Sequence, residues 1–185
     1  CVEVRGRKKC GLPHELGSTG FGVAHAAAVA AKFKKLDIKK ATVAIEGFGN
    51  VGSFAFKFLK EMGAKIVAVA DSRGAVFSDS GFNEDTLHRL KLEGKSVADY
   101  PNAKKLPRET IFGLDVDILI PASVSDVINE RNKDLKRAKI IVSGANIPMS
   151  EEIEEELVGR GILVVPDFVA NAGGVISSYA EYRGY

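Results

Sequence analysis

Three glycines carry the clearest chemical signal in the sequence: Gly47, Gly49 and Gly52, in the segment GFGNVG. With this spacing the first glycine allows a tight turn, the second lets a phosphate approach the backbone, and the third lets a helix pack closely against a strand. A helix that begins there also offers its free N–H groups and the positive end of its dipole to an anion. The glycines therefore predict a binding site for the pyrophosphate of a dinucleotide.

The surroundings of these glycines strengthen the prediction. An apolar, β-branched run at 41–46 predicts a buried strand before them, and an apolar stripe over 50–63 predicts a helix after them. Asp71 closes the next apolar run, KIVAVAD, where an acidic residue binds ribose hydroxyls. The alternative for Asp71 is a role as the first residue of a turn. A second glycine cluster, at 17–22, has neither the spacing nor a preceding strand.

Small and amide residues follow several of the predicted strands, at 49–50, 121–123, 144–146 and 167–171. In open α/β sheets ligands bind outside the carboxyl ends of the strands. Asparagine suits a nicotinamide carboxamide because it offers both a donor and an acceptor. Asparagine and glycine also end strands and start turns, so either interpretation holds for any single residue. Because four such segments share one edge, we interpret them as a ligand site.

The elements that must position these residues alternate between strands and helices. Strands are predicted at 41–46, 65–71, 117–122, 139–146 and 162–167, with a small β excursion at 75–77. Helices are predicted at 18–36, 50–63, 83–93 and 151–161, from near Asn171 onward, and more weakly within 123–137. Ser18 and Thr19 are the expected N-cap residues of the first helix, and Ser150 is the expected N-cap of the helix at 151–161. The segment 94–108 is predicted to be loop. The strands are continuous apolar runs, which is typical of a parallel sheet covered on both faces. We therefore predict an α/β fold with a doubly wound, mostly parallel sheet, a Rossmann-like dinucleotide-binding domain.

Composition excludes several other classes. The 185 residues include 26 Lys and Arg and 24 Asp and Glu, so no basic excess indicates a nucleic-acid partner. No apolar run is long enough to cross a membrane. Cys1 and Cys10 are too few for a disulfide framework or a structural zinc site, which favours a reduced, cytoplasmic protein. Residues 1–17 are interpreted as a lead-in segment and 18–185 as the dinucleotide-binding domain.

Taken together, these motifs resemble the dinucleotide-binding domain of the glutamate dehydrogenases, in the glutamate/leucine/phenylalanine/valine dehydrogenase family. The resemblance covers nearly the whole chain and rests on STGFGV (18–23), EGFGNVG (46–52), VAVADSRGAV (67–76), LIPAS (119–123), SGANIP (143–148) and VVPDFVANAGGVISSYAEY (164–182). It implies NAD or NADP as cofactor. In the full-length enzyme it implies oxidative deamination of L-glutamate to 2-oxoglutarate and ammonia.

The resemblance also implies roles for single residues. It places Gly49, Asn50 and Val51 around the pyrophosphate, and Asp71 and Ser72 at the adenosine ribose. Thr19 and Asn50 would lie near the nicotinamide, Asn146 would contact the ribose on the nicotinamide side, and Asn171 would face both nicotinamide and substrate. Ala122 and Ser123 would line the cofactor cleft. Ser178 corresponds to a hydroxyl that binds the distal carboxylate of glutamate, where leucine-type relatives carry an apolar residue. The alternative for Ser178 is a hydrogen bond back to its own helix.

One departure from the family matters for catalysis. The family's catalytic lysines and acid lie in an N-terminal domain that no segment of this chain resembles. We therefore assign no catalytic and no metal-binding residue, and we expect the isolated chain to bind cofactor without turnover. Full-length relatives are typically hexamers, which implies a homo-oligomer. Two alternatives stay open: the same domain of a leucine, phenylalanine or valine dehydrogenase, and a stand-alone module that senses dinucleotides.

Overall fold

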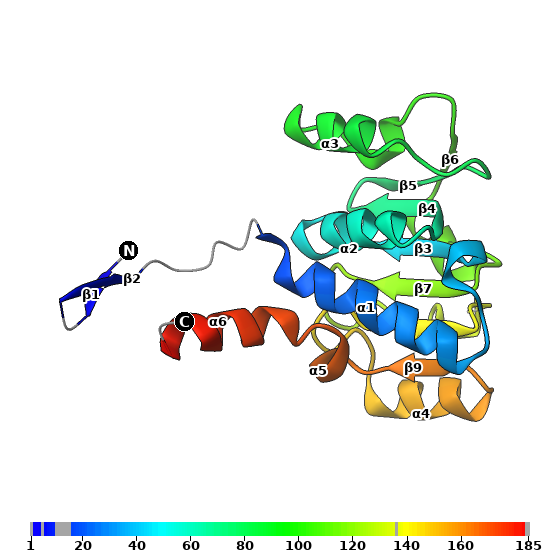
Figure 1. Cartoon of the computed structure of the whole chain (residues 1–185). Coiled ribbons are helices and arrows are strands. Elements are labelled where there is room, and N and C mark those ends of the chain that lie inside the picture. Colours follow the sequence, from blue (N-terminus) through cyan, green and yellow to red (C-terminus); the bar gives the residue numbers. More distant parts are fainter. Residues whose placement is uncertain (1, 5, 10–15, 136, 184–185) are drawn as a thin grey trace.

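The computed structural model describes residues 2–4, 6–9, 16–135 and 137–183, and their main feature is a seven-stranded sheet (Figure 1). Its strands, in spatial order, are β6 (Lys104–Leu106), β5 (Gly74–Phe77), β4 (Lys65–Asp71), β3 (Thr42–Glu46), β7 (Ile118–Pro121), β8 (Ile140–Val142) and β9 (Leu163–Val165). The five strands from β4 to β9 in this order are parallel, and β5 and β6 extend the sheet antiparallel. The predicted mostly parallel sheet is confirmed.

The helices alternate with the strands as predicted, although most end earlier. They are α1 (Ser18–Phe33), α2 (Asn50–Glu61), α3 (Glu84–Leu92), α4 (Glu151–Gly159), α5 (Asp167–Ala170) and α6 (Gly173–Arg183). Short 3₁₀ helices are η2 (Ile38–Lys40), η3 (Val97–Asp99), η4 (Arg108–Gly113) and η5 (Lys133–Leu135). The lead-in segment contains a feature that the sequence did not predict, the antiparallel pair β1 (Val2–Val4) and β2 (Arg7–Lys9).

The sheet separates two hydrophobic cores, as a doubly wound fold requires. Val43 and Ile45 of β3 pack on the face covered by α1 and α2. Ala44, between them in sequence, packs on the opposite face with Ile111 of η4 and Ile153 of α4. Since side chains alternate along a strand, β3 contributes to both cores and is buried from both sides.

The start of α1 differs from the prediction. Ser18 and Thr19 were expected to cap the helix, but both lie inside it, and the N-cap residue is Gly17. Gly17 has a left-handed backbone with φ 71°, and its carbonyl accepts the first intrahelical bond, from the Phe21 N–H at 2.9 Å. The N-cap has no side-chain hydrogen bond, because a glycine occupies it.

The weak helix predicted within 123–137 is wrong, because the α-helix is replaced by turns and by η5. Asp126 has a φ of 54°, which interrupts any helix. The Asn129 side chain accepts from the Arg131 N–H, and the Asn132 side chain accepts from the Asn129 N–H and donates to the Val127 carbonyl. Such side-chain bonds compete with helical ones.

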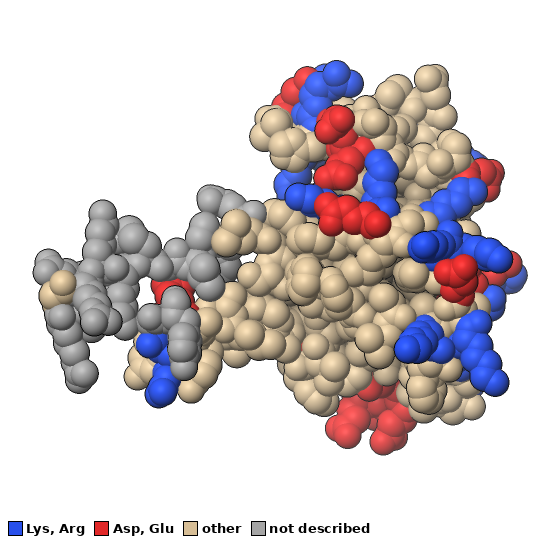
Figure 2. Space-filling model, in the orientation of Figure 1, with Lys and Arg blue, Asp and Glu red and all other residues tan. Residues whose placement is uncertain are grey.

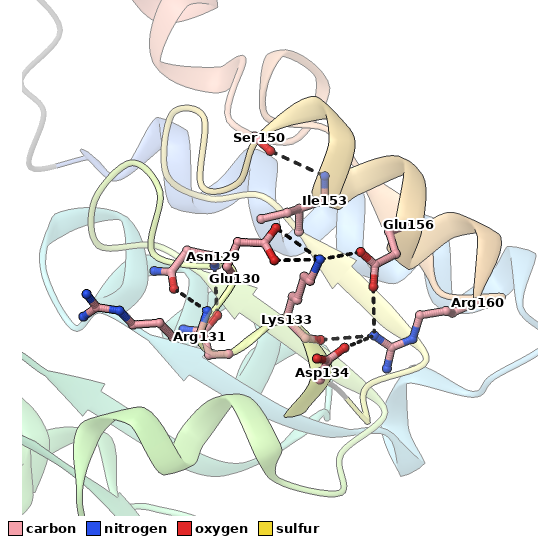
Figure 3. A network of polar contacts seen from close by, with 10 residues as sticks. Asn129, Glu130, Arg131, Lys133, Asp134, Ser150, Ile153, Glu156 and Arg160 are labelled. Atoms are coloured by element: carbon pink, nitrogen blue, oxygen red, sulfur yellow. Dashed lines mark hydrogen bonds and ion pairs between the residues drawn. The ribbon is translucent and has the colours of Figure 1, made fainter.

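The same segment is attached to α4 by an ion pair. Lys133 pairs with Glu130 and with Glu156 of α4, which holds the segment against that helix (Figure 3).

Two further boundaries need correction. The segment 94–108 was predicted to be loop, but it contains η3 and β6, which pairs with β5. The last helix was expected to begin near Asn171, but the chain forms α5 before this residue and α6 after it. Asn171 is the C-cap residue of α5, so it lies at the junction of two helices.

Candidate functional site

The order of the strands places a crevice beside β3. From β3 the chain crosses to β4 on one side, and it returns to β7 on the other side. Loops that leave neighbouring strands in opposite directions open a crevice at the carboxyl ends, which is where open α/β sheets bind ligands. The loops in question are 47–49 after β3 and 122–123 after β7, and they lie in direct contact.

The glycine loop has the geometry that its sequence predicts. Gly47 has a φ of 94°, and a methyl group added to it would lie 2.6 Å from the Ser123 nitrogen. Only glycine fits this turn. A methyl group added to Gly49 would meet no atom within 4 Å, so this residue faces open space. Gly49 is the N-cap of α2 and no side chain caps that helix. Gly52 is buried against the Gly47 carbonyl.

Two cavities open at this edge of the sheet. One, of about 450 Å³, is lined by Gly47, Phe48, Gly49, Asn50, Val51, Asp71, Ser72, Ala122 and Ser123. The other, of about 470 Å³, is lined by Thr19, Val51, Ala122, Ser123, Gly144, Ala145, Asn146, Asn171, Gly174, Val175 and Ser178. They share Val51, Ala122 and Ser123. The structure thus gathers every predicted site residue except Gly52 around two adjoining cavities, the first of them beside the glycine loop.

Asp71 is already hydrogen-bonded within the protein. Its Oδ1 accepts from the Arg73 N–H and the Ser96 hydroxyl, both at 2.8 Å, and its Oδ2 accepts from the Val97 N–H at 2.8 Å. Asp71 therefore starts its own turn and also holds the first turn of η3. A carboxylate offers about four acceptor positions, so these bonds leave capacity for a ribose hydroxyl.

Two asparagines line the second cavity, and a residue with a strained backbone, Ile147, follows one of them in the chain. The Asn171 side-chain amide donates to the side-chain oxygen of Asn146 at 2.7 Å, which joins the segment after β8 to the end of α5. Ile147 has a φ of 45°, which is rare for a β-branched residue. Asp167 holds this conformation by accepting from the Ile147 N–H at 2.8 Å. Strain of this kind clusters at binding sites, where it fixes a neighbouring side chain.

Ser178 lines the second cavity, and its hydroxyl donates to the Gly174 carbonyl at 3.0 Å. This is the bond back to its own helix that the sequence left open as an alternative. A substrate carboxylate would have to replace Gly174 as the acceptor of this hydroxyl hydrogen.

Sequence reasoning missed an ion pair beneath both cavities. The Glu46 side chain is completely buried, and its carboxylate lies 2.7 Å from Arg108 Nη2 and 2.8 Å from the Ser123 hydroxyl. Glu46 gave a signal, because an acid ends an otherwise apolar strand. Arg108 gave none, because it is distant in sequence and lies in a segment that was predicted to be loop.

The described residues place a single ionisable side chain at the cavities. Among them no lysine lines either cavity, and Asp71 is the one carboxylate that does. Burial lowers the pKa of Lys91, but this residue belongs to α3 and lines neither cavity. Within the described part of the chain there is no cluster of metal ligands, and no helix is long and apolar enough to cross a membrane.

Comparison with known proteins identifies relatives across nearly the whole chain. The sequence model of the glutamate/leucine/phenylalanine/valine dehydrogenases matches residues 11–184. A glutamate dehydrogenase of Aeropyrum pernix is 46% identical over 179 residues, covering 93% of this chain and 43% of the relative. An NADP-specific glutamate dehydrogenase of Saccharolobus shibatae is 47% identical over 179 residues, covering 93% and 42%. The chain thus spans about two fifths of the length of these curated relatives.

Solved structures of glutamate dehydrogenases have a similar fold. The hetero-hexameric glutamate dehydrogenase of Thermus thermophilus, in a leucine-bound form, superposes with a TM-score of 0.82 at 29% identity, covering 90% of this chain and 39% of that one. A further glutamate dehydrogenase structure gives a TM-score of 0.83 at 26% identity, covering 96% and 43%.

Proposed function

The chain belongs to the glutamate/leucine/phenylalanine/valine dehydrogenase family, and we propose that it is the NAD(P)-binding part of a glutamate dehydrogenase. The observation that carries this proposal is the pair of adjoining cavities at the switch point of the sheet, one of them beside the glycine loop. A dinucleotide has two nucleotide halves, and two cavities joined at Val51, Ala122 and Ser123 match that division.

In this proposal the cavity beside the glycine loop takes the adenosine half and the pyrophosphate. Gly49, Asn50 and Val51 surround the phosphates at the start of α2, and Asp71 and Ser72 bind the adenosine ribose. The other cavity takes the nicotinamide half, with Thr19, Asn146 and Asn171 around its ribose and carboxamide. The nicotinamide supplies the hydride chemistry, and these residues orient it.

The cofactor is NAD or NADP. Relatives named NADP-specific or NADP(+)-dependent glutamate dehydrogenase favour NADP. Asp71 favours NAD, because its carboxylate would face a 2′-phosphate. Arg73 is exposed and donates one bond to the Gly94 carbonyl, which leaves further guanidinium donors for a phosphate.

Glutamate is the proposed substrate of the full-length enzyme, because the relatives named above are glutamate dehydrogenases and because Ser178 offers a hydroxyl to a distal carboxylate. A leucine, phenylalanine or valine dehydrogenase is the second candidate. Replacing Ser178 by valine in the full-length enzyme should raise KM for glutamate at least about tenfold, since a lost bond to a charged group costs about 1.5–3 kcal/mol. An unchanged KM would remove Ser178 as an argument for glutamate.

The oligomeric state and the cellular compartment of the full-length protein are part of the same proposal. The full-length protein would be a hexamer, by analogy with the hetero-hexameric glutamate dehydrogenase of Thermus thermophilus. The low cysteine count favours the cytoplasm.

Calorimetric titration of the purified chain with NAD and with NADP tests the central proposal. We expect saturable one-to-one binding of at least one of them. Absence of binding by both, in a chain shown by circular dichroism to be folded, would reject it.

A further inference from the structure

Glu46 is the last residue of β3 and its side chain is fully buried. Both Nε and Nη2 of Arg108 donate to its Oε1, at 3.2 and 2.7 Å. A buried carboxylate is costly unless it is paired, and removal of one partner leaves an uncompensated charge. This position therefore needs Arg108, which η4 brings to the carboxyl end of the strand through the buried side chains of Ile111 and Phe112.

Ser123 joins the ion pair to the loop after β7. Its hydroxyl lies 2.8 Å from both oxygens of Glu46, and Arg108 Nη2 donates to the same hydroxyl at 3.2 Å. Each of the three side chains thus contacts the other two. The hydroxyl hydrogen is directed to Glu46, so Ser123 can offer a cofactor only a remaining lone pair.

The backbone repeats this connection. The Ala122 N–H donates to the Glu46 carbonyl at 2.6 Å, and Gly47 approaches Ser123 so closely that no side chain fits between them. Glu46 therefore links the two loops of the crevice through both its main chain and its side chain. Ala122 and Ser123 line both cavities, so any ligand that spans the cavities must pass this link.

We propose that Glu46 and Arg108 are positioning residues that, through the Ser123 hydroxyl, hold the two crevice loops at the spacing a dinucleotide needs to occupy both cavities. This inference rests on the proposed function. Because the two charges cancel, the pair adds no net charge beneath the pyrophosphate. A ligand confined to one cavity does not need the spacing between the loops.

The test removes the pair without changing the net charge, in the double variant E46M/R108M. Apolar side chains of similar volume often replace a buried ion pair without loss of stability. The Kd for NAD and NADP should rise about tenfold. The Kd for AMP, which occupies the cavity beside the glycine loop alone, should change by less than about twofold. An equal change for AMP and the dinucleotides, or no change for either, would overturn the inference.

A matched control lies at the other end of the same strand. Asp117 accepts from the Thr42 N–H and hydroxyl at the start of β3 and pairs with Lys139 at 2.7 Å. The variant D117N/K139Q also removes an ion pair at constant net charge. Its Kd for AMP, NAD and NADP should equal that of the parent. If this control weakens dinucleotide binding as much as E46M/R108M, the effect is general destabilisation and the inference fails.

The variant S123A distinguishes a positioning role of the Ser123 hydroxyl from direct contact with the cofactor. S123A should weaken dinucleotide binding in the parent and have no further effect in E46M/R108M, because both changes break the same link. Additive effects would mean that Ser123 binds the cofactor directly, and would reject the proposed route. S123A also serves as the test if the double variant does not fold.

Hydrogen exchange separates this inference from the proposed function. The Ala122 amide should exchange faster in E46M/R108M and S123A than in the parent, whether or not a cofactor binds. If the parent binds no dinucleotide, the proposed function is wrong, and the Ala122 exchange rate still shows whether the link holds the loops. An unchanged exchange rate would reject the link itself.

Discussion

The two edges of the sheet use charge differently. At the carboxyl edge, Asp71 is the one charged side chain among the described residues that line the two cavities, and the Glu46–Arg108 pair lies beneath them. At the amino edge, a cavity of about 380 Å³ is lined by four cationic side chains, namely Lys34, Arg137, Lys139 and Arg160. Figure 2 shows the same difference, with lysine and arginine gathered where α1 ends and the strands begin, and few charges over α1 and α6.

The comparison indicates what each edge contributes. The amino edge is held by pairs in which at least one partner is exposed, such as Lys139 with Asp117 and Arg160 with Glu156 and Asp134. Pairs of this kind contribute about 0–1 kcal/mol each and are screened by salt. The carboxyl edge instead presents backbone N–H groups, small residues and amides, which suit a ligand that carries its own charge. The two edges should therefore respond differently to matched substitutions.

The largest expected effect concerns turnover at the carboxyl edge. Deamination needs a proton acceptor and a cleft that excludes water, and the described residues offer no lysine there. The isolated chain should show no glutamate-dependent reduction of NAD or NADP. Joining it to the lysine-bearing lobe that the family resemblance implies should restore turnover. Absorbance at 340 nm under saturating cofactor measures both; activity of the isolated chain would reveal a catalytic group that we have missed.

The second prediction compares a glycine from each edge. The added side chain of G49V projects into open space, and the φ of −81° requires no left-handed backbone. G49V should therefore fold normally and lose about 100-fold or more in affinity for the dinucleotide. The control is G159V at the end of α4, where an added methyl group also meets no atom. Calorimetry should find the affinity of G159V unchanged, and equal losses in both variants would contradict the assignment of the glycine loop.

The sequence predicted the carboxyl edge well where local chemistry decides structure. A buried strand, a left-handed Gly47 and a helix that begins at Asn50 follow from six consecutive residues and their flanks. The helix prediction within 123–137 failed because Asn129 and Asn132 bond to nearby backbone, and because Lys133 pairs with Glu156 of α4, a partner distant in sequence (Figure 3). The Glu46–Arg108 pair was not predicted at all, because no local pattern in the sequence indicates a partner that only the folded sheet brings close.

The third prediction concerns Asp71, the charged residue at the carboxyl edge. Its carboxylate would face the 2′-phosphate of NADP, and two like charges a few ångströms apart typically cost about 1 kcal/mol or more. The parent chain should bind NAD at least as well as NADP. D71N should shift the ratio of the two Kd values about fivefold toward NADP, which corresponds to about 1 kcal/mol. A tenfold preference of the parent for NADP would instead favour Arg73 as the residue that reads the phosphate.

The smallest effect is expected at the amino edge and concerns stability alone. Burial by itself would raise the pKa of Asp117, but bonds from Lys139 and from the Thr42 N–H and hydroxyl outweigh it and leave the pKa below its usual value. A lowered pKa in the folded state stabilises the protein above the unfolded value of about 3.9, and this contribution disappears as the pH falls through the folded pKa. D117N should therefore unfold about 1 kcal/mol more easily in urea at pH 7, because the pair with exposed Lys139 is screened. The difference from the parent should shrink as the pH falls below the unfolded value, and it should vanish only below the lowered pKa of the folded state, where Asp117 in the parent is protonated as well. Cofactor affinity should not change at pH 7, so a D117N variant that binds NAD more weakly without unfolding would show that the two edges are coupled.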